Sequence, residues 1–215
     1  MNTLKEITYN IAEIVGAETD FATIQRLEEQ VLHHRALILR RTMDRSSRIG
    51  KEFISTIVID TEIKDGTNYA DFGIPLCVTK QQIPYIVDFK EINGFTYVGS
   101  IDKVSAYTRL MCLSDLRFID SNRYSQKRPY YVYEDNKIYI TYFPEKLLIR
   151  GVFEDPRKLV GFKDLDDNPT WEESMPLPIS ADLLQMVVQA VVSSEATMVR
   201  FSNKQEVTIE SNKNT

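Results

Sequence analysis

Two stretches of the chain decide its fold: RPYYVYEDNKIYITYFPEKLLIRGVFEDPRKL at residues 128–159 and PLPISADLLQMVVQAVVSSEATM at residues 176–198. In the first stretch, Asp135-Asn136 separates two runs that alternate apolar and polar residues. This pattern is typical of two antiparallel strands joined by a tight two-residue turn. Residues 146–153 predict a third strand. A short helix should follow, because Asp155-Pro156 is a good pair for an N-cap and a first helical position.

The second stretch predicts a long amphipathic helix. Ser180 serves as the N-cap and Asp182 lies in the first turn, where the helix dipole favours negative charge. Residues spaced by three and four form the stripe expected to be buried: Leu183, Met186, Val187, Ala190, Val191 and Met198. Leu184, Val188 and Val192 widen this stripe. An apolar face of that width predicts contacts on more than one side of the helix.

The first forty residues predict two further helices. Thr3 and Glu6 have the spacing of a capping box, and Gly16 is a suitable end for the first helix. Asp20 caps a second helix, whose apolar seam is Ile24, Leu27, Val31, His34 and Ile38. Because the linker between the two helices is short, they are expected to pack as an antiparallel pair.

Between the second and third helices the apolar period changes from helical to alternating. Strands are predicted at residues 53–60, 83–89, 95–98, 130–133 and 137–143, with a short helix at 113–122. The sequence thus predicts an α+β fold in which the N- and C-terminal helices form a helical bundle, with a central β-rich insertion between them in the sequence. The expected domains are a discontinuous bundle (1–50 and 155–202), the insertion (51–154) and a C-terminal docking arm (203–215).

The order of these elements, with GVFEDP at residues 151–156 followed by PLPISADLL at 176–184, resembles a phage protein family. It is similar to the head-to-tail connector (adaptor or ring) proteins of short-tailed phages, especially crAss-like phages and the tail tubular protein A group. The likeness is closest over residues 130–199. The resemblance implies a virion structural protein, not an enzyme, that forms a ring of twelve copies at the head-tail junction after assembly in the host cytoplasm.

The resemblance also implies partners: the chain itself in the ring, the portal protein above it, and neighbouring tail or ring proteins. Genomic DNA would pass through the channel during ejection without specific binding. No membrane and no cofactor are expected. Two other interpretations stay open. One is another tail component, such as a stopper or tail completion protein, and the other is a small nucleic-acid-binding protein.

Charge is distributed unevenly along the chain. The net charge is −5, yet the window from His33 to Lys51 holds six basic residues against a single acidic one, Asp44, so it carries +5 and the remainder carries −10. Such asymmetry predicts a surface that meets a negative partner, either protein or phosphate. The candidate residues are Arg40, Arg41, Arg45 and Arg48 at a subunit interface, although the same run is also compatible with a solvated helix face.

Three other segments are candidate subunit or partner interfaces. Tyr131 and Tyr133 belong to a tyrosine-rich hairpin that predicts an interface or core in preference to nucleic-acid stacking. Asp164, Asp166 and Asp167 form an acidic loop that lacks the spacing of a calcium-binding EF-hand. In the tail, Val207 and Ile209 are the apolar anchors of a predicted docking arm that gains order from a partner.

No combination of residues predicts catalysis. His33 and His34 are adjacent, so on a helix they point about 100° apart and cannot converge on one ion. The sequence contains neither a nucleophile elbow nor a glycine-rich phosphate loop. Cys77 and Cys112 lack the spacing of a metal or redox motif and are expected to be free thiols. No catalytic, cofactor-binding or metal-binding residue is therefore predicted.

Overall fold

The computed structural model describes residues 2–17, 20–43, 49–63, 76–87, 94–118, 128–141 and 144–196. The chain divides into two compact units. One comprises Met1–Ser46 with Glu173–Thr215 and is called the helical unit; the other comprises Ser47–Glu172 and is called the sheet unit. Residues 155–172, which the sequence pattern grouped with the helices, are part of the sheet unit.

Helix α1, Leu4–Val15, begins and ends at its predicted signals. The amide of Glu6 donates to the Thr3 hydroxyl at 3.2 Å, and the amide of Thr3 donates to the Glu6 carboxylate at 2.9 Å. Both bonds of the predicted capping box are present. Gly16 ends the helix with a φ of 71°, a left-handed conformation that glycine adopts without the steric cost of a Cβ.

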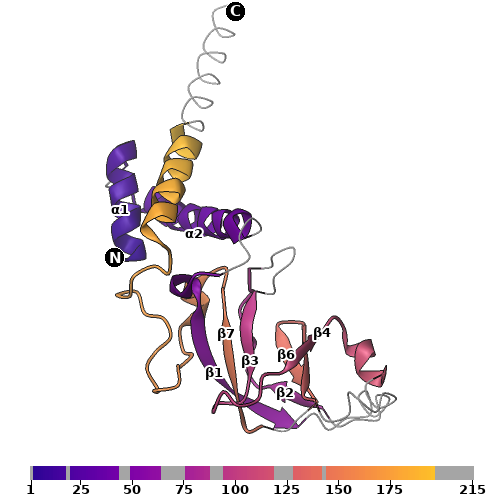
Figure 1. Cartoon of the computed structure of the whole chain (residues 1–215). Coiled ribbons are helices and arrows are strands. Elements are labelled where there is room, and N and C mark those ends of the chain that lie inside the picture. Colours follow the sequence, from indigo (N-terminus) through magenta and orange to yellow (C-terminus); the bar gives the residue numbers. More distant parts are fainter. Residues whose placement is uncertain are drawn as a thin grey trace, which may run out of the picture. The chain divides into compact units, whose positions relative to one another are not determined.

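The second and third helices complete the helical unit. Helix α2, Phe21–Met43, is capped by Asp20, whose carboxylate accepts from the Ala22 amide at 3.1 Å. The third helix, residues 181–196, begins directly after Ser180 as predicted. Figure 1 shows α1 and the third helix running in the same direction while α2 runs across them, so the predicted antiparallel pair is wrong. The buried residues of the unit are mainly aliphatic: Leu4, Ile7, Ile11, Ala12, Leu27, Val31, Leu32, Leu39, Val187 and Val191.

The sheet unit contains one seven-stranded sheet. Its strands are β1 (Ser55–Ile63), β2 (Cys77–Thr79), β3 (Phe95–Gly99), β4 (Thr108–Leu110), β5 (Tyr130–Glu134), β6 (Lys137–Ile140) and β7 (Lys146–Gly151). The order across the sheet is β3-β7-β1-β2-β6-β5-β4. All pairs are antiparallel except β4 with β5. Short 3-10 helices occur at Lys51–Phe53, Leu113–Phe118 and Pro156–Leu159.

The sheet curves until its two edge strands nearly meet, which gives a barrel-like form (Figure 1). The Tyr107 amide, just before β4, donates to the carbonyl of Val98 in β3 at 2.8 Å. Phe95 of β3 packs edge-on against Tyr131 and Tyr133 of β5, with ring centroids 6.2 and 5.1 Å apart. Because β3 and β5 are not neighbours in the sheet, these rings can meet only across a curved interior.

The predicted hairpin with its two-residue turn is confirmed. Strands β5 and β6 pair through Glu134 and Lys137, and the turn residues Asp135 and Asn136 have φ values of 51° and 59°. Positive φ at both turn residues is the signature of a type I′ turn, whose twist matches that of the flanking strands. The short helix after Asp155 is also present, with the Asp155 carboxylate accepting from the Arg157 amide.

The predicted fold class, a helical bundle with a β-rich insertion, is wrong. The main body is a β-rich unit with a nearly closed seven-stranded sheet, and the three helices of the described residues come from the two ends of the chain. Two causes explain the error. Strands β2 and β4 have only three residues each, too few to show an alternation of apolar and polar residues. The sequence pattern therefore does not reveal how large the sheet is. The wide apolar face of the third helix suggests the core of a helical bundle, but part of this face lines an open groove and is not core.

Candidate assembly surfaces

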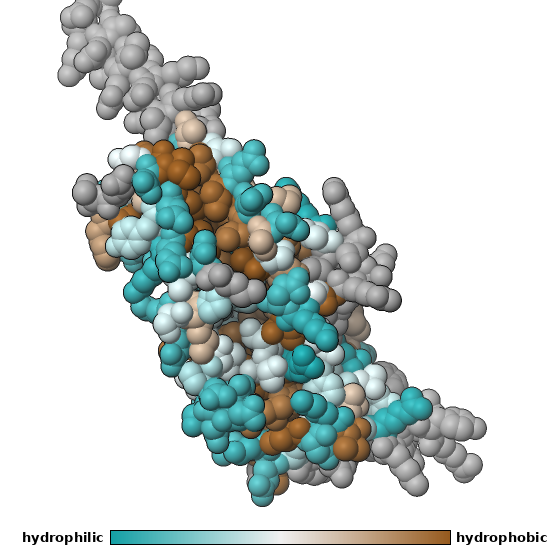
Figure 2. Space-filling view, turned by 60° about the vertical axis from the view of Figure 1, so that its left-hand side comes forward, coloured by the Kyte–Doolittle hydropathy of each residue, from teal (hydrophilic) through white to brown (hydrophobic). Residues whose placement is uncertain are grey.

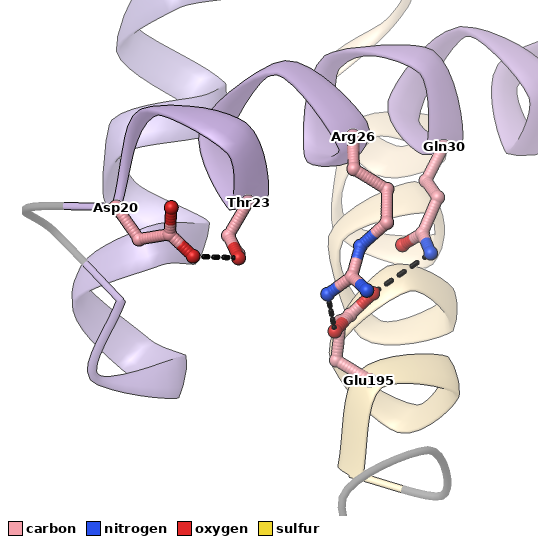
Figure 3. A network of polar contacts seen from close by, with 5 residues as sticks. All are labelled: Asp20, Thr23, Arg26, Gln30 and Glu195. Carbon is pink, nitrogen blue, oxygen red and sulfur yellow. Dashed lines mark hydrogen bonds and ion pairs between the residues drawn. The ribbon is translucent and has the colours of Figure 1, made fainter.

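A buried carboxylate anchors the third helix on α2 (Figure 3). Glu195 is 4% exposed and lies in the last described turn of the third helix. Its two carboxylate oxygens accept from the Arg26 guanidinium at 2.7 Å and from the Gln30 amide at 2.8 Å. Because a carboxylate is costly to bury unless it is paired and hydrogen-bonded, these two partners fix the position of this turn of the third helix against α2.

The segment before the third helix is held by another buried charge. Arg35 of α2 is 1% exposed, and its Nε and one terminal nitrogen donate to the Pro178 carbonyl at 3.1 and 3.0 Å. The sequence places Arg35 in the basic window as a surface charge, but the structure puts it inside the helical unit. Arg35 and Glu195 together tie both ends of the segment 178–195 to α2.

One flank of the third helix forms an open apolar groove with α1. The groove has a volume of about 660 Å³. Its lining carries no formal charge: Asn2, Ile14, Leu177, Ile179, Ala181, Leu184, Gln185, Val188, Gln189 and Val192. Figure 2 shows apolar side chains gathered in a strip on the helical unit. The residues that widen the predicted stripe thus line a surface, while Val187 and Val191 on the adjacent face are fully buried.

The basic end of α2 lies on the other side of the third helix. Arg41 is exposed, Arg40 is half-buried, and Arg41 lines a hollow of about 300 Å³ together with Met186, Ile38 and Thr42.

Burial lowers the pKa of His34 below its ordinary value, and the nearby His33 and Arg41 lower it further. The candidate residues Arg45 and Arg48 lie outside the described residues, as do Val207 and Ile209.

The tyrosine-rich hairpin faces the core of the sheet unit. Tyr131 is 3% exposed and Tyr133 is half-buried against Phe95. On the opposite face of the hairpin, Val132 and Tyr139 pack with Leu76 and Val78, with Leu110, Leu113 and Tyr130 against them. Both faces are therefore covered. Tyr131, Tyr133 and Tyr139 stabilise the sheet and are not arranged as a stacking surface for nucleic-acid bases.

The acidic loop is exposed and organised by its own backbone. The Asp164 carboxylate accepts from the amides of Asp166 and Asn168 at 2.8 and 2.9 Å. Asp167 has a positive φ of 59° and pairs with Lys163 at 3.5 Å. The Asp164 carboxylate is thus engaged within the loop itself. Asp166 and Asp167 are exposed to solvent and form a negatively charged surface on the sheet unit.

The described part of the chain holds no group of three or more His, Cys, Asp or Glu residues placed to bind a metal ion. None of its helices is long and apolar enough to cross a lipid bilayer. Cys77 is buried and donates to the Glu62 carbonyl, and Cys112 is half-buried; both are free thiols. The surfaces that distinguish this molecule are thus the apolar groove, the basic end of α2 and the acidic loop.

Sequence reasoning missed the roles of Glu195 and Gln30, because a polar residue in an apolar stripe does not reveal its partner. The sequence does contain a signal for the groove. The apolar face of the third helix is wider than packing against a single neighbouring helix requires.

The comparisons with known proteins extend over both units. A family model described as phage tail ring protein 2, of the crAss-like phage ring proteins, matches residues 6–214. No curated protein matches the chain. The family match confirms the resemblance that the order of elements indicated, and it covers the helical unit as well as the sheet unit.

Proposed function

The chain belongs to the phage tail ring protein 2 family, and from this premise we propose that it assembles as a closed homo-oligomeric ring at the head-tail junction. Membership of this family makes it a structural component of the phage tail. In the proposed ring, twelve copies lie below the portal and the genome passes through the central channel without specific binding. The action is mechanical and not catalytic, and assembly takes place in the host cytoplasm.

The observation that carries this proposal is the family match over nearly the whole chain, joined to the open apolar groove on the helical unit. Large exposed apolar patches on soluble proteins mark interaction sites. A ring closes when one surface of each copy binds a different surface of the next by a rotation that returns to the start. A groove on one flank of the third helix and a basic surface on the other provide two such surfaces.

Mass and symmetry measurements test the ring directly. Native mass spectrometry and light scattering of the purified chain should give a multiple of the 24.9 kDa monomer, with twelve copies expected in the virion. A reconstruction of the tail should show the chain as a closed ring next to the portal. A chain that stays monomeric and occupies no symmetric ring in the virion would contradict the proposal.

Charge reversal tests the predicted interface arginines. Changing Arg40, Arg41 and Arg45 to Glu should leave the monomer folded and prevent its entry into virions, since several charges at one interface decide partner choice. The control reverses three exposed cations of the sheet unit, Lys80→Glu, Lys103→Glu and Lys146→Glu. Normal incorporation of the arginine variant would show that these side chains form only a solvated face.

The C-terminal arm, residues 203–215, is proposed to dock on an adjacent protein through Val207 and Ile209. Deleting residues 203–215 should leave a folded monomer that no longer attaches to its partner. Unchanged attachment of the truncated chain would show that these residues are a passive terminus.

A further inference from the structure

The third helix has two apolar faces, and only one of them is used within the chain. Val187 and Val191 are fully buried, whereas Leu184, Val188 and Val192 line the open groove together with Ile14 of α1. Since exposed apolar surface has a free-energy cost in water, a continuous open strip indicates a surface that is covered in the assembled state.

The charges beside the groove indicate the chemistry of what covers it. The lining itself is uncharged, but the exposed Glu13 precedes the lining residue Ile14, and the exposed Asp182 follows the lining residue Ala181. Among the described residues of α1 and the third helix, the only cation is Lys5, which is ion-paired with Glu173. The occupant is therefore expected to carry an apolar side chain flanked by positive charge.

The opposite flank of the same third helix offers that combination. Met186 is 53% exposed, and it lines a hollow together with the exposed Arg41 at the basic end of α2. Methionine is flexible and fills irregular apolar gaps well. An exposed Met beside an exposed Arg is complementary in both polarity and charge to an apolar groove that is bordered by Glu13 and Asp182.

We propose that Met186 of one copy inserts into the groove of the next copy, with Arg41 placed against Glu13 and Asp182. The groove and the Met186–Arg41 surface lie on different flanks of one helix, so each copy contacts two neighbours through two different patches. Contacts of this heterologous kind generate rings when the rotation closes. The inference rests on the proposed ring and specifies which surfaces form its subunit contact.

The first test changes the groove without touching the core. Val188→Glu places a charge in the groove and should reduce ring formation about tenfold or more, because a charge must lose its hydration to enter an apolar contact. Tyr9→Glu is the matched control, since Tyr9 is a 55% exposed apolar residue of α1 that does not line the groove. Circular dichroism of each monomer verifies the fold, and native mass spectrometry measures the ring fraction.

The second test identifies the occupant. Arg41→Glu should block ring formation, and adding Glu13→Lys and Asp182→Lys to the same chain should restore it. Rings formed normally by Val188→Glu would overturn the inference, and so would a block by Arg41→Glu that the double reversal does not relieve. In that last case a different segment or protein fills the groove. If the unchanged chain forms no ring at all, the proposed function itself fails, which distinguishes the two outcomes.

Discussion

The sheet unit and the helical unit place their apolar residues differently. In the sheet unit, three successive residues of β7, Leu147, Leu148 and Ile149, are fully buried, which a strand achieves only when both of its faces are covered. In the helical unit, the third helix covers one apolar face and leaves the other as an open groove. The sheet unit therefore covers its apolar residues within itself, whereas the helical unit leaves an apolar surface open, and this is the surface at which we propose that another copy binds.

The largest effect is expected from a substitution that unfolds the helical unit alone. Val187→Asp puts an unpaired charge at a fully buried position of the helical unit and should destabilise that unit by about 4 kcal/mol or more. The single tryptophan of the chain, Trp171, is buried in the sheet unit and reports on it separately. We expect the helical circular dichroism signal to fall while the Trp171 emission stays native.

Gln189→Asp is the control for this variant, because it adds the same charge at an exposed site of the same helix. If Val187→Asp melts like the parent chain, Val187 is not part of a cooperative core. If both signals are lost together, the two units do not fold independently.

The next largest effect is expected at the polar anchor of the third helix. Arg26→Ala removes the ion pair of the buried Glu195 carboxylate and leaves its hydrogen bond to Gln30 (Figure 3), and should lower the free energy of unfolding by about 2–3 kcal/mol. Glu195→Gln should cost only about 1 kcal/mol, because Arg26 is half-exposed and can be hydrated instead. Urea unfolding followed by circular dichroism measures both. If Arg26→Ala and Glu195→Gln lower the free energy of unfolding equally, the burial of the Glu195 charge does not determine the strength of its contact with Arg26.

A smaller effect is expected in the sheet unit. Asp135→Val should destabilise the β5–β6 hairpin by about 1–2 kcal/mol, since a β-branched residue disfavours the positive φ of 51° found there. Glu134→Val, one residue earlier in extended backbone, is the control and should be close to neutral. The unfolding midpoint of the Trp171 emission gives the difference. A neutral Asp135→Val variant would mean that the turn adopts another conformation.

The smallest effect is a pH dependence of the helical unit. Burial, His33 and Arg41 lower the pKa of His34, so the folded state favours its neutral form. Neutral His34 therefore makes its full contribution to the stability of the folded state above the ordinary histidine pKa of about 6.5. This contribution is lost as the pH falls below about 6.5 and through the lowered pKa. His34→Gln should flatten this loss between pH 7 and 5, measured by helical unfolding midpoints. An unchanged slope in that variant would assign the dependence to other groups.

Local signals in the sequence predicted local structure well. The capping box of Thr3 and Glu6, the end of α1 at Gly16 and the turn at Asp135-Asn136 were all readable, because each depends on residues within a few positions of one another. The three-residue strands β2 and β4 could not be predicted from the sequence. They exist because longer neighbouring strands supply their hydrogen bonds, and three residues carry no detectable period.

The candidate surfaces were less predictable than the fold elements, because exposure depends on contacts between distant segments. Arg35 reads as one more cation in a basic window, yet the Pro178 carbonyl, far along the chain, accepts its hydrogen bonds inside the helical unit. Tyr131 reads equally well as an interface or a core residue, and Phe95 across the sheet decides for the core. The wide apolar stripe of the third helix predicts a second contact, and in the structure this side of the helix lines an open groove.

The near-closure of the sheet has a consequence for solubility. Open edge strands are templates for pairing with other chains, and identical copies held at high local concentration are especially exposed to that hazard. Here the bond from Tyr107 to Val98 and the bridge between Gly99 and Ala106 join the regions next to the two edges of the sheet. Backbone pairing between copies is thereby discouraged where the edges meet. In the proposed ring, recognition between neighbouring copies would then depend on side chains, which bind a partner more specifically than the edge of a strand does.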